Sequence, residues 1–118
     1  VWKVKKHLPY VSSPLVHEGM VYVVKNGGLA SAFALADGAP IYQGERMDAA
    51  GDYYSSPVAA GDRIYVASQK GVVVVHSIKA PFNVLARNDL AEQVFATPAI
   101  VDGALYVRTE KNFYRFAR

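Results

Sequence analysis

Histidines are the first side chains in this sequence to consider for acid–base or metal chemistry. His7, His17 and His76 are separated by 10 and 59 residues, and these spacings match no metal-ligand motif. The chain has no cysteine, which excludes a thiolate metal site, a cysteine nucleophile and a disulfide scaffold. We therefore expect strand or surface histidines and no metal site.

The acidic and hydroxyl side chains also lack a catalytic pattern. Aspartates fall in predicted turns and linkers, where the carboxylate hydrogen-bonds locally, and no Asp-x-Asp-x-Asp-Gly calcium loop occurs. Serines or threonines recur before prolines once per repeat, without a Gly-x-Ser-x-Gly elbow. We expect no catalytic residue, and the sequence favours a non-catalytic protein over an enzyme.

Composition and charge indicate one ordinary globular domain or part of a larger protein. The chain has 118 residues, 52% hydrophobic and 19% charged, and its 17 valines and 8 tyrosines favour strands. A formal net charge of +3 is too small to indicate nucleic-acid binding. No apolar run is long enough for a membrane span, and the first residues lack the apolar segment of a signal peptide.

The sequence repeats itself. Pro14, Pro57 and Pro98 are 43 and 41 residues apart, and the copies align without a gap for about twenty residues after each proline. Each copy predicts short strands separated by turns that contain glycine. The predicted strands are 15–17, 20–25, 29–35 and one near 41–42; 58–60, 63–68, 72–78 and 82–86; and 99–101, 104–108 and 113–116.

Four antiparallel strands per repeat of this length are the signature of a β-propeller blade. We predict an all-β fold of about three four-stranded antiparallel blades in a single segment, 1–118. The blade repeats are expected at about 8–45, 50–87 and 92–118, with 1–6 as an outer strand. Because propellers usually have about 4–8 blades, the chain is expected to be the C-terminal part of a larger propeller or half of a dimeric ring.

The repeat resembles that of the pyrroloquinoline-quinone-like, quinoprotein-type β-propellers, in particular their C-terminal blades. The matching features are the Ser-Ser-Pro opening, the Gly-x-x-Tyr-Val of the second strand, and a third strand that ends in Ala34-Leu35-x-Asp37-Gly38. In that family a later tryptophan docks one blade on the next. The resemblance implies that Trp2, Tyr42 and an aliphatic residue near Leu85 take this place. The structural repeat positions are Trp2, Pro14, Tyr22, Tyr42, Pro57, Tyr65, Pro98 and Tyr106.

The resemblance implies a non-catalytic propeller scaffold for protein or ligand binding, in a periplasmic or secreted bacterial protein. The expected partners are other blades of the same protein or a second copy, with another protein as a further candidate. No cofactor is expected. The first alternative is a fragment of a quinone-dependent alcohol or sugar dehydrogenase, which would use pyrroloquinoline quinone with calcium. The second alternative is a carbohydrate- or peptide-sensing domain.

Departures from the repeat predict a ligand-binding group. Arg108 places a charge where the other copies have Val24 and Ala67, and Tyr53 and Tyr54 precede the second Ser-Ser-Pro. We expect these three residues near the mouth of the central channel, because a guanidinium beside aromatic rings suits an anionic or planar ligand. The alternative is that Arg108 pairs with an acid of a neighbouring blade.

Overall fold

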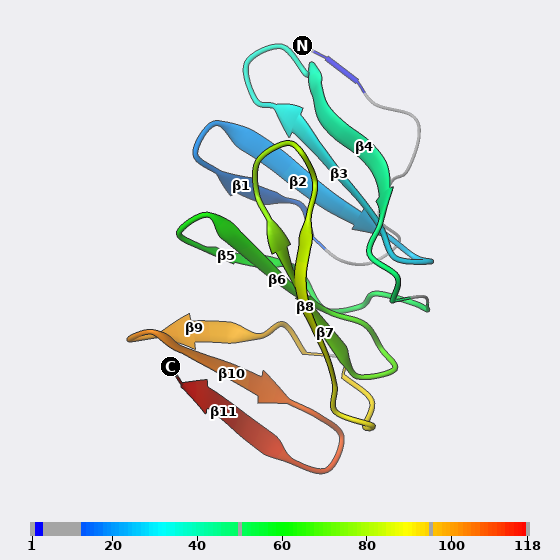
Figure 1. The fold of residues 1–118 in the computed structure, drawn as a ribbon, viewed down its shortest axis with the longest axis vertical. Helices are drawn as coiled ribbons and strands as arrows, with labels where there is room; N and C mark the ends of the chain where they lie inside the picture. Colours follow the sequence, from blue (N-terminus) through cyan, green and yellow to red (C-terminus); the bar gives the residue numbers. More distant parts are fainter. Residues whose placement is uncertain (1, 4–12, 50, 95, 118) are drawn as a thin grey trace.

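The computed structural model describes residues 2–3, 13–49, 51–94 and 96–117, and its strands form three antiparallel sheets stacked along the longest axis (Figure 1). We call these sheets blades one, two and three. Blade one contains β1 (Leu15–His17), β2 (Met20–Lys25), β3 (Leu29–Ala34) and β4 (Pro40–Arg46); blade two contains β5 (Val58–Ala60), β6 (Arg63–Ala67), β7 (Val72–Ser77) and β8 (Val84–Asp89); and blade three contains β9 (Ala99–Val101), β10 (Ala104–Arg108) and β11 (Phe113–Ala117).

The strands agree with the predicted meander, except at the outer strand of each complete blade. β4 continues to Arg46 and β8 to Asp89, past the predicted ends at Tyr42 and Ala86. Both outer strands pair along most of the preceding strand, with a register shift on the way. The predicted outer strand 1–6 falls largely outside the described residues, and Trp2 and Lys3 are not in a strand.

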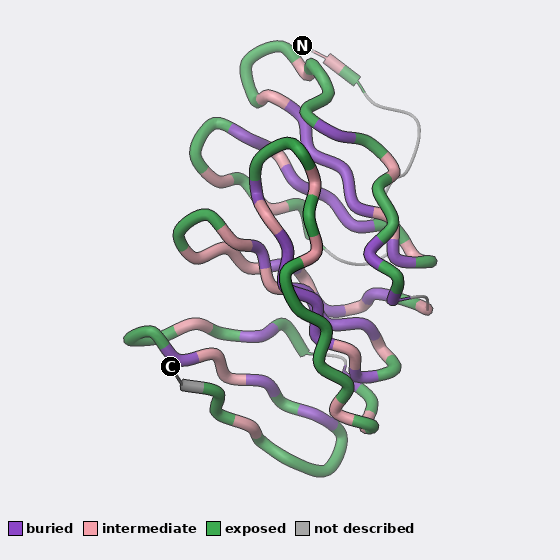
Figure 2. The backbone as a smooth tube through the Cα atoms, in the orientation of Figure 1, coloured by how far each residue is buried: buried purple, intermediate pink, exposed green. Residues whose placement is uncertain are grey.

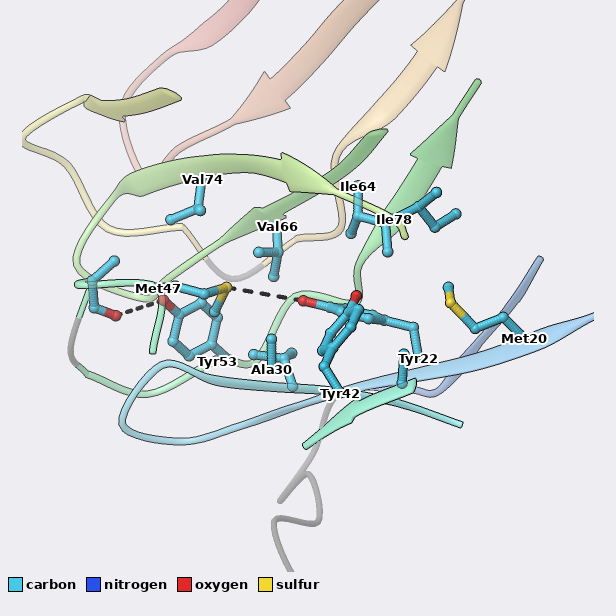
Figure 3. Packing of buried hydrophobic residues seen from close by; sticks show 13 residues of the cluster. Met20, Tyr22, Ala30, Tyr42, Met47, Tyr53, Ile64, Val66, Val74 and Ile78 are labelled. Carbon is cyan, nitrogen blue, oxygen red and sulfur yellow. Dashed lines mark hydrogen bonds between the residues drawn. The ribbon is translucent and has the colours of Figure 1, made fainter. Parts of the chain in front are cut away.

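The main apolar core lies between blades one and two. Blade one contributes Tyr22 and Tyr42, blade two contributes Ile64 and Val66, and Met47 comes from the linker between the blades (Figure 3). A smaller core between blades two and three contains Ala67, Val73, Val94 and Val107. Blade two therefore packs against a neighbour on both faces; its strands β6 and β7 are largely buried, whereas its outer strand β8 is largely exposed, the green segment in front in Figure 2.

A chain of hydrogen bonds accounts for the hydroxyl that precedes each proline. The backbone N–H of Ser13 donates to Ser56 Oγ at 2.9 Å, and the backbone N–H of Ser56 donates to Thr97 Oγ1 at 2.9 Å. The hydroxyls of blades two and three thus each accept from the same position of the blade before them. The repeat preserves these residues because they set the register between neighbouring sheets.

Aromatic side chains fill the contact between one blade and the outer turn of the next. The Trp2 indole lies on Gly38, where any side chain would collide with the ring, and Trp2 Nε1 donates to the Leu35 carbonyl oxygen at 3.0 Å. Tyr42 repeats this arrangement one blade later, with its ring centroid 5.2 Å from that of Phe82. Trp2 and Tyr42 thus lie where one blade contacts the outer turn of the next, whereas Leu85, near the third expected docking position, is 47% exposed.

Each linker between blades crosses close to a turn of the blade that it leaves. A Cβ at Gly71 would collide with the Glu92 carbonyl oxygen, and Gly71 has a φ of +99°, so only glycine suits this position. The Glu92 carboxylate then accepts hydrogen bonds from Thr109, Asn112 and Tyr114 of blade three. These bonds, that of Asn112 first, lower the pKa of Glu92. Glu92 therefore fixes the linker to blade three.

Substitutions of Tyr42 test the docking contact. Tyr42 is buried, and its hydroxyl has no hydrogen-bond partner within the described residues. Tyr42→Phe is expected to leave the free energy of unfolding unchanged or raise it by up to about 1 kcal/mol, because an unsatisfied buried hydroxyl is removed. Tyr42→Ala is expected to lower it by about 3–5 kcal/mol. Urea unfolding measures both variants.

The matched control is the exposed Leu85→Ala, which is expected to change the free energy of unfolding by less than about 0.5 kcal/mol. A loss in Tyr42→Phe as large as that in Tyr42→Ala would contradict this account of the interface.

Candidate functional site

Tyr53 does not face a channel, unlike the position expected for it. It is 1% exposed and belongs to the core between blades one and two. Its hydroxyl donates to the Ala49 carbonyl oxygen at 2.5 Å, and its backbone N–H donates to Asn26 Oδ1 at 2.7 Å. Burial raises the pKa of Tyr53. The side chain therefore anchors the linker that leads into blade two.

The other two predicted ligand-binding residues are more accessible than Tyr53. Tyr54 is half-buried, whereas Arg108 is exposed at the end of β10. Arg108 contributes to an open recess with Thr97, Ala99, Val101, Tyr106 and Phe113. Neither Tyr53 nor Tyr54 lines this recess, so the structure places Arg108 with a different set of aromatic residues from the predicted one.

Pairing within blade three shows which side chains share the face around Arg108. Arg108 is opposite Phe113, and Tyr106 is opposite Arg115. Residues directly opposite in an antiparallel pair point to the same side of the sheet. The Tyr106 and Phe113 ring centroids are 5.8 Å apart, and Arg115 Nε donates to the Tyr106 hydroxyl at 3.2 Å. We call the face formed by Tyr106, Arg108, Phe113 and Arg115 the outer face of blade three.

Register shows that the outer face of blade three corresponds to the faces that blades one and two turn toward the following blade, where Tyr22 is buried and Tyr65 is half-buried. Tyr22 opposes Ala32 in blade one and Tyr65 opposes Val75 in blade two, at the place of the Tyr106 pair. The earlier faces are covered by the following blade, whereas Phe113 is 69% exposed. The outer face of blade three thus occupies the position of an inter-blade interface, but it is exposed and carries two arginines.

His76 carries a side chain of a kind that is common in active sites, although the sequence predicted an ordinary strand or surface histidine. It is fully buried between blades one and two, and its Nε2 is 2.6 Å from the Tyr22 hydroxyl. Nδ1 is 2.8 Å from the Ser77 carbonyl oxygen. Because a carbonyl only accepts, Nδ1 carries the proton and Nε2 accepts from Tyr22. Both ring nitrogens are therefore used within the fold.

Burial fixes the charge of this pair. Loss of solvation lowers the pKa of His76 to about 4 and outweighs the hydrogen bond to Ser77, which acts in the opposite direction. Burial likewise raises the pKa of Tyr22, so both groups are neutral at pH 7. The Tyr22 hydroxyl also lies 3.9 Å from Met47 Sδ (Figure 3). A neutral, fully engaged histidine of this kind stabilises the interface between two blades.

His76 makes stability depend on pH in a defined window. Between the ordinary pKa of 6.5 and about 4 the unfolded chain binds a proton that the folded chain excludes. The free energy of unfolding is expected to fall by about 3 kcal/mol as pH decreases through this window. In His76→Phe, which copies Phe33 of blade one, this decrease should be largely absent when unfolding is followed at pH 4 to 7.

His17→Asn provides the control, because His17 is only partly buried and lies beside Glu18. It should retain the pH dependence of the parent chain. Equal pH dependence in His76→Phe and the parent would show that His76 does not cause it.

No three histidine, cysteine, aspartate or glutamate side chains are grouped to hold a metal ion in the part of the chain that the structure describes. The same residues include no helix that is long and apolar enough to cross a membrane.

Comparison with solved structures supports the architecture. A quinohemoprotein alcohol dehydrogenase, ADHIIG, from Pseudomonas putida HK5 matches with a TM-score of 0.68 and 17% identity, over 90% of this chain and 17% of that chain. BamB from Moraxella catarrhalis matches with a TM-score of 0.47 and 14% identity, over 88% of this chain and 41% of that chain. The chain thus spans less than half the length of either protein. The first likeness confirms the predicted fold class, all-β propeller blades.

The family comparison gives a further result at the level of sequence. No curated protein gives a significant match. The model of the family described as outer membrane protein assembly factor BamB matches residues 1–80, which is more than half of the chain. This match confirms the resemblance seen in the repeats. The chain belongs to the BamB family of β-propeller repeats.

Proposed function

We propose that the chain is a non-catalytic propeller scaffold that binds a protein partner through the outer face of blade three. The observation that carries this proposal is the exposure of a face whose counterparts in blades one and two are turned toward the following blade. The family membership supports a scaffold in the periplasm or outside the cell. Another blade or a second copy would meet the same surface.

The chemistry of the face defines the partner. Tyr106 and Phe113 supply aromatic area, and aromatic residues and arginine are enriched where proteins bind one another. Arg108 and Arg115 supply guanidinium groups that pair with carboxylates in a forked geometry. An extended segment that carries both apolar and acidic side chains on one side, at every second residue, would match the rings and the guanidinium groups together.

The described residues do not by themselves provide a calcium site for the quinone-dependent alternative, a fragment of a larger dehydrogenase. Pyrroloquinoline quinone with calcium would need several acidic oxygen ligands at one place, and the described ranges contain no such cluster. His76, Tyr22 and Tyr53 are also buried, and their polar atoms form hydrogen bonds within the fold. We therefore derive no catalytic step for this chain.

Binding of a designed peptide tests the proposed interface. The probe is a ten-residue peptide in which every second residue, on one side of the extended chain, is alternately Glu and Phe. It is titrated into the 118-residue chain and followed by NMR shifts. We expect saturable binding with shifts confined to β9, β10 and β11. The double variant Arg108→Ala and Arg115→Ala should weaken binding at least about tenfold, because two charge-assisted contacts are lost.

Two controls separate specific binding from general charge attraction. Arg46→Ala removes an exposed arginine of blade one and should leave the affinity unchanged. A peptide with Lys in place of Glu should not bind. Equal binding of the acidic and basic peptides, or an unchanged affinity in the double variant, would overturn the proposed role of this face. Dye reduction by the chain with pyrroloquinoline quinone, calcium and an alcohol would overturn the non-catalytic proposal.

A further inference from the structure

A cavity of about 230 Å³ lies between blades two and three. Its walls include Val73, Val75 and Asn88 of blade two, and Ile100, Leu105 and Phe116 of blade three. The wall is mainly apolar and also includes the Tyr65 ring of blade two, with the Asn88 amide and the Tyr65 hydroxyl as hydrogen-bonding groups. The cavity lies on the opposite side of blade three from Arg108 and Arg115 and is independent of the proposed function.

The register of the outer strands explains why the cavity exists. In blade one, Tyr42 pairs with Ala32 and sends its ring into the interface with blade two. In blade two, the residue in the same register is Ala86, which pairs with Val75. A methyl group therefore stands where the preceding interface has a phenol ring. Ala86 is exposed and does not itself line the cavity, but Asn88, two residues further along β8, does, so the space has the position of a missing docking side chain.

The aromatic position on the opposite wall is present in every blade. Phe33 pairs with Val21, His76 pairs with Ile64, and Phe116 pairs with Leu105, which places these three rings in equivalent registers. Phe33 faces the Trp2 ring, with centroids 6.3 Å apart. His76 lies in the core that contains Tyr42. Phe116, at the cavity, is 41% exposed, and the ring that blade two contributes to the same cavity is that of Tyr65 in β6, not one from the outer strand β8.

We propose that this cavity binds a small planar aromatic molecule of the indole or phenol class. Its ring would lie against Phe116 and the valines of β7, as Trp2 lies against Phe33, with its N–H or O–H directed to Asn88. Dry apolar cavities of about 150 Å³ bind benzene, so the present cavity has room for a larger ring. A polar group at one edge of the ring is also what Trp2 and Tyr42 have, the indole and the phenol that occupy the other interfaces.

Indole itself is the probe for the first test. We expect saturable methyl shifts at Val73, Val75 and Leu105 when indole is titrated into the 118-residue chain. Ala86→Trp should place a tethered indole in the cavity, lower the affinity for free indole at least about tenfold, and raise the melting temperature by about 3–8 °C. Leu85→Trp makes the same change at the neighbouring exposed residue and should leave indole affinity unchanged.

A second variant keeps the test decisive if Ala86→Trp fails to fold. Phe116→Leu removes the ring on the far wall, and the affinity for indole should fall at least about fivefold while cyclohexanol, a non-aromatic probe, binds no more weakly than before. The proposal is overturned if the parent chain shows no saturable shift up to the solubility limit of indole. It is also overturned if a folded Ala86→Trp binds indole as tightly as the parent.

Discussion

Contact between neighbouring sheets is the interaction on which the rest of this structure depends. A four-stranded antiparallel sheet buries only one face against a single neighbour, and an isolated small sheet has marginal stability in water. Blade two packs against a neighbouring sheet on both sides, and its strands β6 and β7 are largely buried. The repeat residues act mainly between sheets, as the hydroxyl contacts from Ser13 to Ser56 and from Ser56 to Thr97 show.

The same constraint determines what the polar side chains do. His76, Tyr22 and Tyr53 have the chemical character of catalytic groups, yet each is buried with its polar atoms bonded inside the first interface. Glu92 is similarly engaged by three side chains of blade three. Side chains that can bind other molecules remain where an interface between blades is incomplete. The outer face of blade three is one such place, and the cavity beside Ala86 is the other.

The strands and repeat could be predicted from the sequence because local patterns determine them. The proline spacing and the alternation of apolar residues predicted β1, β2, β5, β9 and β10 with their observed bounds. The site was harder to predict because it depends on pairing across strands. The turn of blade three is one residue shorter than in the other copies, which places Arg115 and Phe113 on the same face as Arg108. Alignment from the proline alone does not show this shift.

Burial of His76 and Tyr53 could not be predicted either, because it requires knowing which faces of two different sheets meet. One signal was present in the sequence: His76 stands at the repeat position of Phe33, and an aromatic position in a repeat favours burial. The space beside Ala86 had a comparable signal in the loss of an aromatic residue from the fourth strand. In both cases the departure from the repeat marks a place where the interface between blades differs.

Native-state amide hydrogen exchange, followed by NMR on the 118-residue chain, tests the central role of the interfaces most directly. If blade contacts determine stability, the amides of β6 and β7 should have the highest protection, since this sheet is covered on both sides. The amides of β10 and β11 should exchange earlier as one cooperative unit, because the interface with blade three is smaller and contains a cavity. Equal opening free energies in all three sheets, or blade two opening before blade three, would contradict this account.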